Sequence, residues 1–82
     1  MDTPSRTLNQ LGTELRRFRK KRDLTQLQLS TQINKRQATV SSLEASGSGT
    51  LDTLYAILSA LDLELVIRPR SKNESRKLGD IF

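Results

Sequence analysis

The chain contains no cysteine and no histidine among its 82 residues. Without cysteine it can form neither a disulfide nor a thiolate zinc site. Without histidine it has no imidazole general base, no Ser-His-Asp triad and no histidine metal ligand. The four glycines, Gly12, Gly47, Gly49 and Gly79, do not form a phosphate-binding loop. We therefore expect no enzyme, no cofactor, no metal and no small-molecule substrate.

Long hydrophobic runs are also missing. No stretch approaches the ~18 apolar residues that a membrane-spanning helix needs. The first six residues lack the apolar segment of a signal peptide. We expect a cytoplasmic protein without a membrane partner. A chain of 82 residues forms at most one small domain with a modest core, so burial against a partner would supplement its stability.

The net charge of +5 is unevenly distributed along the chain. Six of the 14 basic residues lie between Arg16 and Arg22, and Lys35 and Arg36 form a second pair. A basic run on a helix can be no more than a solvated face. A clustered basic face is also typical of a protein that binds phosphates, and charge alone leaves both interpretations open.

Capping residues predict the first two helices. Thr7 and Gln10 fit a capping box, as do Thr25 and Gln28. The first helix should run to about Arg22 and the second to about Gln32. Residues 1–6 are expected to be a flexible arm. The first helix should bury one face, which consists of Leu8, Leu11, Leu15 and Phe18. The second should be stapled at its start by Leu24 and Leu29.

Two further helices are predicted after a turn at Asn34, whose side chain tolerates positive φ. The third helix should run from Arg36 or Gln37 to Ala45, with apolar residues Ala38, Val40 and Leu43. A flexible breaker, Ser46–Gly49, should follow. Thr50 should cap a fourth helix that ends at Asp62. Its buried stripe should consist of Leu51, Leu54, Ile57, Leu58 and Leu61, with Tyr55 half-buried beside it.

The segment Leu63–Arg68 favours a β-strand because it is rich in β-branched residues, and Pro69 should end it. A lone strand needs a partner for its backbone. The simplest partner is the same strand of a second copy, which gives a two-fold dimer. The interface would then include Leu63, Leu65, Val66 and Ile67. The alternative is an extended segment packed on the helices of its own chain.

The second and third helices together fit a helix-turn-helix, in which a second helix rich in polar side chains enters the major groove. The motif needs a small residue on its first helix, for which Ser30 is suited, and a turn residue such as Asn34. Val40 and Leu43 would face the core. The opposite face would offer hydrogen-bonding groups, namely Arg36, Gln37, Thr39, Ser41 and Ser42.

Two stretches, Leu15–Ser30 and Gln37–Glu44, resemble the Xre/Cro/phage-repressor family. The Thr25-Gln26 opening and the closing Ser-x-x-Glu at Glu44 are the most specific marks. The resemblance implies an all-α, lambda-repressor-like DNA-binding domain of four to five helices over residues 7–62. A dimerisation strand over 63–70 and a flexible tail over 71–82 would follow. Asn34 departs from the glycine that is usual in the family, and Ser30 departs from a frequent alanine.

Within that family, Arg36–Thr39, the leucine-rich fourth helix and Leu63–Pro69 are similar to HipB-type antitoxins. These are dimeric operon repressors that also bind and neutralise a HipA-type kinase toxin. The resemblance therefore implies three partners: double-stranded operator DNA, a second copy of the chain, and a HipA-like kinase.

The resemblance also implies roles for single residues. Arg36, Gln37, Ala38 and Ser42 would face base edges, where arginine suits guanine, glutamine suits adenine and alanine suits the thymine methyl group. Taken alone, Gln37 would be an ordinary surface glutamine. Phosphates would be held by Thr25, Gln26, Thr39, Ser41, Arg19 and Lys21, with Thr25 and Gln26 at a helix N-terminus. Arg19 would also form an ion pair with Glu44.

The C-terminal tail is polar except for Leu78, Ile81 and Phe82. Apolar residues on a polar tether can anchor a chain in a partner's pocket, or they can be tolerated without a role. Three functions remain open: an antitoxin and repressor, a stand-alone Xre-type regulator, and an adaptor that has lost DNA binding. The basic first helix and the Arg36-Gln37 pair argue against the adaptor.

Overall fold

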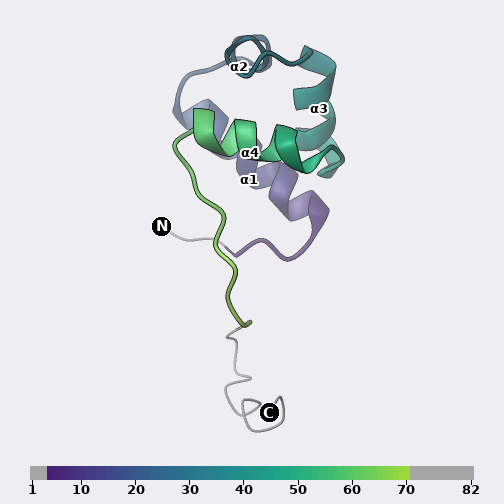
Figure 1. Ribbon diagram of the computed structural model, residues 1–82, viewed down its shortest axis with the longest axis vertical. Coiled ribbons are helices and arrows are strands. Elements are labelled where there is room, and N and C mark those ends of the chain that lie inside the picture. The colour runs from purple at the N-terminus through teal and green to yellow at the C-terminus, as the bar shows by residue number, and fades with distance from the viewer. Residues whose placement is uncertain (1–3, 71–82) are drawn as a thin grey trace, which may run out of the picture.

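The computed structural model describes residues 4–70, and that part of the chain folds into four α-helices. They are α1 (Leu8–Lys21), α2 (Gln26–Gln32), α3 (Gln37–Ser46) and α4 (Leu51–Ala60). Figure 1 shows α2 and α3 together at one end, with α4 in front of α1. The segment after α4 runs away from the helices towards the other end. The all-helical class predicted from the sequence is confirmed.

Side-chain caps begin three of the four helices. Thr7 accepts a hydrogen bond from the Gln10 N–H at 3.1 Å, and the Gln10 side chain accepts one from the Thr7 N–H at 3.1 Å. Thr25 and Gln28 repeat this capping box at 3.0 and 2.8 Å. Thr50 caps α4 through the Thr53 N–H. Because each cap satisfies N–H groups that have no partner within the helix, the sequence specifies where these helices begin.

Three of the helices end in the same way, on an Asp or Asn with left-handed backbone. Asp23, Asn34 and Asp62 follow α1, α2 and α4 with φ of 56°, 59° and 61°. In each case the next residue donates its N–H to a carbonyl of the last helical turns, as Lys35 does to Ser30 at 2.9 Å. This is the Schellman arrangement, in which a short polar side chain replaces the usual glycine. The predicted role of Asn34 in the turn is confirmed.

The connection between α3 and α4 differs from the prediction. Gly47 has φ of 78°, donates its N–H to the Leu43 carbonyl at 2.8 Å and is buried. A β-carbon at Gly47 would overlap the backbone of Leu8, and one at Gly49 would lie 2.8 Å from Cγ of Leu43. The predicted flexible breaker is therefore a tight turn packed against α1 and the core. Helix α3 extends one residue past the expected end, to Ser46.

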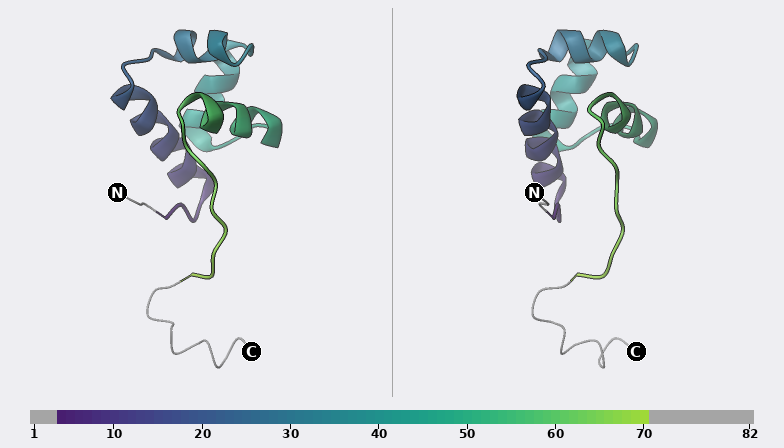
Figure 2. Two further views of the ribbon diagram at one scale, coloured as in Figure 1. Left: turned by 60° about the vertical axis from the view of Figure 1, so that its left-hand side comes forward. Right: turned by 90° about the vertical axis from the view of Figure 1, so that its left-hand side faces the viewer.

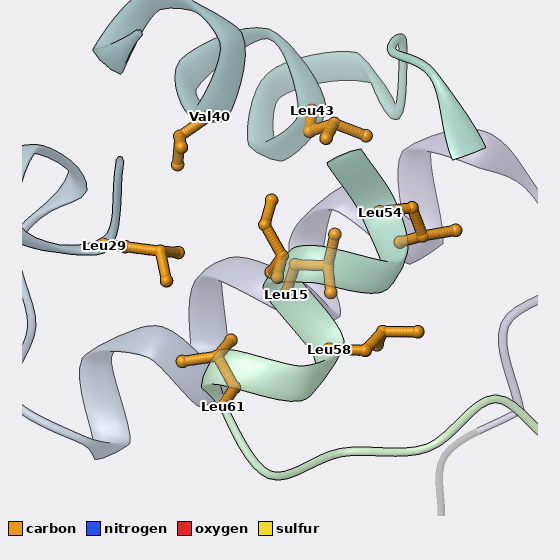
Figure 3. Close-up of a cluster of buried hydrophobic side chains, with 8 residues drawn as sticks. Leu15, Leu29, Val40, Leu43, Leu54, Leu58 and Leu61 are labelled. Atoms are coloured by element: carbon orange, nitrogen blue, oxygen red, sulfur yellow. The ribbon is translucent and has the colours of Figure 1, made fainter. Parts of the chain in front are cut away.

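All four helices contribute to one hydrophobic core (Figure 3). Helix α3 packs against α1 and α2, and α2 also packs against α4. Six further hydrophobic residues are partly buried and pack against this core, namely Leu11, Phe18, Leu24, Ile33, Ala60 and Leu63. The buried residues are Leu15, Leu29, Val40, Leu43, Leu54, Ile57, Leu58 and Leu61.

Three residues predicted to join the core are exposed instead. Leu8 is 62% exposed, Leu51 is 71% exposed and Tyr55 is 53% exposed. Leu8 and Leu51 are the first residues of their helices, so they project beyond the layer that the neighbouring helices cover. Tyr55 lies one turn after Leu51 on the same side of α4. A periodic pattern predicts which face of a helix is buried. It does not predict over what length of the helix the neighbouring helices cover that face.

The segment after α4 is extended but is not a strand in residues 4–70, so the predicted β-strand is not confirmed and stays a prediction. Leu63 is partly buried against the core. Leu65, Val66 and Ile67 are 46%, 64% and 91% exposed. The alternative, in which this segment packs on its own helices, therefore applies only to Leu63. Figure 2 shows the segment leaving the helices in both views.

None of the helices in the described part of the chain is long and apolar enough to cross a membrane.

The close contact of α1 with α3 predicts that Gly12→Ala destabilises the fold. A β-carbon at this position would lie 2.7 Å from the Glu44 carbonyl oxygen and closer still to that of Leu43, so the two backbones would have to separate. Overpacking costs about 1–3 kcal/mol, which outweighs the ~1 kcal/mol that alanine gains in helix propensity. Urea unfolding should show the loss. The exposed Asn9→Ala in the same helix should change stability by less than about 0.5 kcal/mol; equal stability of the Gly12→Ala variant would contradict the close contact.

Candidate nucleic-acid interface

Helix α3 has one buried face and one exposed face. Val40, Leu43 and Glu44 are buried against the other helices, with exposed fractions of 0%, 2% and 6%. Gln37, Ala38 and Ser42 are exposed on the outside. The structure thus places on one exposed face three of the four residues that the sequence assigned to base contacts.

The fourth, Arg36, is exposed at the N-cap of α3 and makes no side-chain capping bond. It borders a shallow depression whose other lining residues are Asn34, Lys35 and Thr39. Thr39 and Ser41, also on α3, are half-buried. Side chains at this end of the helix are the ones that reach base edges when a recognition helix enters the major groove.

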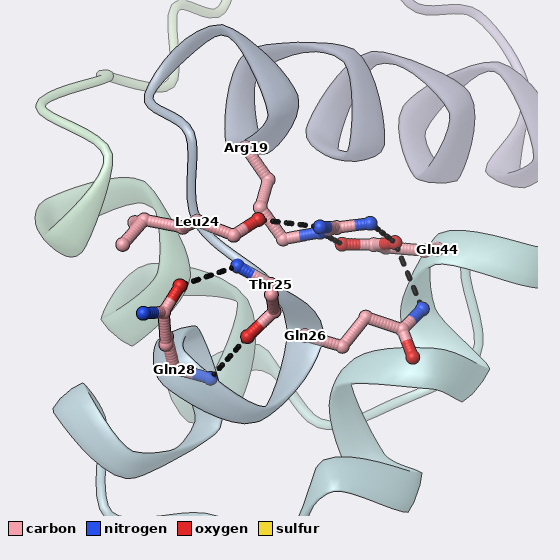
Figure 4. A network of polar contacts seen from close by, with 6 residues as sticks. All are labelled: Arg19, Leu24, Thr25, Gln26, Gln28 and Glu44. Atoms are coloured by element: carbon pink, nitrogen blue, oxygen red, sulfur yellow. Dashed lines mark hydrogen bonds and ion pairs between the residues drawn. The ribbon is translucent and has the colours of Figure 1, made fainter.

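A buried ion pair fixes the orientation of α3. Nε of Arg19 lies 2.6 Å from Oε2 of Glu44, and Nη2 lies 3.0 Å from Oε1 (Figure 4). The third bond of the guanidinium goes to the Leu24 carbonyl at 2.6 Å. The side chains are only 8% and 3% exposed. The predicted pair is present, and its two-pronged geometry links α1 to α3 and to the turn before α2.

Thr25 and Gln26 are engaged within the protein. The hydroxyl and N–H of Thr25 belong to the capping box, and Nε2 of Gln26 donates to Oε1 of Glu44 at 3.0 Å. Gln26 is half-buried and Thr25 is exposed. The backbone N–H groups of Gln26 and Leu27, at the start of α2, have no partner within the helix. An anion at this part of the surface could accept hydrogen bonds from these N–H groups, beside the Gln26 side chain that Glu44 holds in place.

A second ion pair, which was not predicted from the sequence, joins the turn before α3 to the start of α4. Nζ of Lys35, in the turn before α3, lies 3.2 Å from Oδ2 of Asp52 in the first turn of α4. A hydrogen bond from the Thr50 hydroxyl and the nearby Lys35 ammonium lower the pKa of Asp52. Both residues were visible in the sequence as charges, but a separation of 17 positions gave no signal that they meet.

The basic residues of α1 face two directions. Arg16, Arg17 and Lys20 line a shallow groove between α1 and the α2–α3 pair. The remaining lining residues are Thr13, Gln26, Ser41, Glu44 and Ala45. Nζ of Lys21, which the sequence suggested as a phosphate contact, lies 5.6 Å from the centre of the Phe18 ring instead. Lys21 is not part of the groove.

Leu78, Ile81 and Phe82 lie outside the described residues. Within residues 4–70, no group of three or more Asp, Glu, His or Cys side chains is placed to hold a metal ion.

The chain is similar to known helix-turn-helix proteins. A helix-turn-helix family model matches residues 15–67. Among solved structures, a complex of a HipB variant with a 20mer is similar with a TM-score of 0.78 and 27% identity, over 84% of this chain and 97% of that one. HipB in a complex with HipA is similar with a TM-score of 0.76 and 28% identity, over 83% and 97%. No curated protein sequence matches the chain significantly.

The buried ion pair predicts a large loss of stability for Glu44→Ala, because Arg19 would keep a buried charge without its partner. The expected loss is about 3–5 kcal/mol in urea unfolding. Replacing both residues with apolar ones, Arg19→Met and Glu44→Leu, should recover part of that loss.

The pair of Glu14 and Arg17 within α1, whose side chains are 22% and 41% exposed, is far less buried and provides the control. Glu14→Ala should cost no more than about 0.5 kcal/mol. If Glu44→Ala were equally mild, the pair would not hold the helices together.

Proposed function

Because the chain belongs to the Xre-type helix-turn-helix family, we propose that it is a sequence-specific DNA-binding repressor that contacts its operator through α3. The observation that carries this proposal is the division of α3 into two faces. The inner face is fixed by the core and by the Arg19–Glu44 pair. The outer face presents small and polar side chains without large apolar ones, as contact with base edges requires.

Arg36, Gln37, Ala38 and Ser42 are the proposed base-contacting residues. Arg36 can donate two hydrogen bonds to guanine, and Gln37 can bond adenine on two atoms. The methyl group of Ala38 can contact that of thymine. Each two-atom contact discriminates against a wrong base by about 1–3 kcal/mol.

Thr25, Gln26, Thr39 and Ser41 are the proposed phosphate contacts at the edges of that surface. The N–H groups at the start of α2 support this assignment for Thr25 and Gln26, since they favour an anion. Arg19 has five N–H donors, of which three are used in bonds to Glu44 and Leu24. Among the residues suggested as phosphate contacts, Arg19 is assigned chiefly a positioning role, because it bonds Glu44, which in turn holds the Gln26 side chain.

The finer proposal is that this repressor is the antitoxin of a HipBA-like operon, which represses its own promoter and binds a HipA-like kinase. Support comes from the solved HipB complexes, one of which contains HipA. We propose that Leu78, Ile81 and Phe82 contact the kinase. The alternative is a stand-alone Xre-type regulator without a toxin. A kinase-like reading frame beside this one would favour the antitoxin, and its absence would favour the stand-alone regulator.

We also propose that the chain acts as a dimer through Leu63–Arg68. The exposed Leu65, Val66 and Ile67 form an apolar segment with no cover in the single chain. Extended backbone of this kind can pair with the same segment of a second copy and bury these side chains together. Two α3 helices related by a two-fold axis would then match an operator with two half-sites.

The proposed function predicts specific binding to the chain's own promoter region that weakens steeply with salt. Affinity should fall by orders of magnitude between 50 and 200 mM salt, because each neutralised phosphate contributes about −0.9 to the log–log slope. Gln37→Ala and Arg36→Ala should each cost about 1–3 kcal/mol and relax base preference. Gel-shift titrations against the promoter duplex and a scrambled duplex measure both effects.

Thr31→Ala is a suitable control, since Thr31 is exposed on α2, its hydroxyl donates to the Leu27 carbonyl, and it is not among the proposed DNA contacts. It should leave sequence preference unchanged. Absence of a shift, or a shift insensitive to salt, would contradict DNA binding. An unchanged preference in Gln37→Ala would contradict the assignment of α3 as the recognition helix.

The dimer proposal predicts that Val66→Pro yields monomers, because proline removes a backbone donor and cannot continue a paired strand. Sedimentation should show the smaller species, and operator affinity should fall because one half-site is lost. The control substitution Ser71→Pro, beyond the dimerisation strand expected over residues 63–70, should leave the dimer intact. A Val66→Pro protein that remains dimeric would place the interface elsewhere, for instance on the exposed Leu51 and Tyr55 of α4.

A further inference from the structure

The extended segment after α4 leaves its backbone unpaired between two fixed points. Leu63 donates its N–H to the Leu58 carbonyl at 2.7 Å, and beyond it no N–H or carbonyl up to residue 70 takes part in a backbone hydrogen bond within the described chain. Pro69 has no N–H to donate. Between Leu63 and Pro69 the backbone therefore offers a free edge to which a second strand can pair.

Alternate residues of this segment differ in character. Leu63, Leu65 and Ile67 are apolar, and Leu63 packs against the core. Glu64 and Arg68 carry opposite charges and are exposed. Because successive side chains of a strand point to opposite faces, a paired strand would have its apolar residues on the face towards the helices. The two charges would lie together on the outer face.

Neither charge is neutralised within the single chain. Glu64 and Arg68 form no ion pair in the part of the molecule that the structure describes. Arg68 lines a shallow depression that also includes Arg6 and Arg70, and no residue lining that depression is acidic. The surroundings of Arg68 therefore favour a carboxylate that another chain supplies.

Two-fold symmetry restricts the register in which two copies of the segment can pair. Directly opposite side chains of antiparallel strands lie on the same face, so the axis has to pass between a residue and its own copy. Leu65, Val66 and Ile67 are the available centres. With Leu65 at the centre, Arg68 would lie opposite Asp62. The left-handed backbone of Asp62, with φ of 61°, does not continue a strand.

Of the two remaining centres, Val66 gives the more complementary pairs. It places Glu64 opposite the partner's Arg68 on both sides of the axis, while apolar side chains meet on the inner face. A centre at Ile67 would instead place Arg68 opposite the apolar Val66, with Glu64 opposite Arg70. Opposite charges directly across a pair of strands are stabilising and like charges are destabilising.

Backbone hydrogen bonds agree with a centre at Val66. In antiparallel strands every second pair of opposite residues exchanges hydrogen bonds. If Val66 and its copy form one such pair, Glu64 and Arg68 form the next. This ladder needs neither the N–H of Leu63, which is already used, nor one from Pro69. The alternative ladder would end with Leu63 opposite Pro69, where neither residue can donate.

We propose that Glu64 of each copy pairs with the partner's Arg68, and that these two residues select a second copy of this chain as the pairing strand. The inference rests on the proposed dimer and deepens it by fixing its register. A bare strand edge accepts many strands. Charges at these two positions favour a strand with the opposite charges in the same register and disfavour others. Both α3 helices of a dimer would then carry the same base-reading residues.

The test reverses the charges one at a time. Glu64→Arg places arginine opposite arginine at both pairs, and Arg68→Glu places glutamate opposite glutamate. Because two favourable pairs become two unfavourable ones, each variant alone should dimerise about 10-fold or more weakly than the parent protein in sedimentation equilibrium. Arg70→Glu is the matched control. It changes the net charge as Arg68→Glu does, but outside the proposed pairs, and should leave dimerisation nearly unchanged.

Mixing the variants separates charge pairing from damage to the fold. An equal mixture of the Glu64→Arg and Arg68→Glu proteins should form mixed dimers, since one strand then carries only arginine and the other only glutamate at these positions. A double variant with both substitutions should dimerise as the parent protein does, yet form few mixed dimers with it. Energy transfer between fluorescent labels on the two proteins measures both results.

Several outcomes would overturn the proposal. They are single variants that dimerise as tightly as the parent protein, and a mixture of the two that stays monomeric. Loss of the dimer in Arg70→Glu but not in Arg68→Glu would place the centre at Ile67 and would also overturn it. In each of these cases a dimeric parent protein would leave the proposed dimer standing. A monomeric parent protein would contradict the dimer and the register together, while gel shifts test DNA binding separately.

Discussion

The bidentate contact of Arg19 with Glu44 is the interaction on which the arrangement of the helices depends. It joins residues 25 positions apart, and its outer bonds reach Leu24 and Gln26, so α1, α3 and the beginning of α2 converge on one carboxylate. Removing two charges from water is costly, and the pair offsets this cost only because every bond is well placed. Its contribution is therefore geometric. It links α1 to α3 in the same orientation that the shared core and the close approach at Gly12 require.

Local signals in the sequence predicted most of the fold. The capping pairs at Thr7 and Thr25 fixed two helix starts, because a cap acts over three residues and is visible in a short window. Asn34 was identified for a similar reason. The ion pair of Arg19 with Glu44 was found only through the family resemblance, since no local pattern connects two residues so far apart. The pair of Lys35 with Asp52 had no such support and was missed.

The errors have a common physical origin. Leu8 and Leu51 carry the right spacing for a buried face, yet as the first residues of their helices they remain 62% and 71% exposed. The turn at Gly47 has the composition of a flexible linker, but its glycines are there because backbone and side chains approach too closely for a β-carbon. Likewise, the helical period separates the directions of Lys20 and Lys21, but only the position of α2 and α3 beside α1 determines which of the two borders the groove. Composition and hydrophobic period describe one helix or turn at a time. The exposure of Leu8 and Leu51, the close approach at Gly47 and the cations of the groove depend instead on how two elements pack together.

The separation of α3 into two faces has a consequence for how proteins of this kind can diverge. The residues that hold α3 in place are Val40, Leu43 and Glu44, and none of them is exposed. Gln37, Ala38 and Ser42 contribute little to packing, since they lie on the solvent side. Substitutions at these three positions should therefore be nearly neutral for folding. Under the proposed function, single changes at these positions would exchange one operator for another without compensating mutations in the core. Descendants with unlike targets would then share one unaltered scaffold.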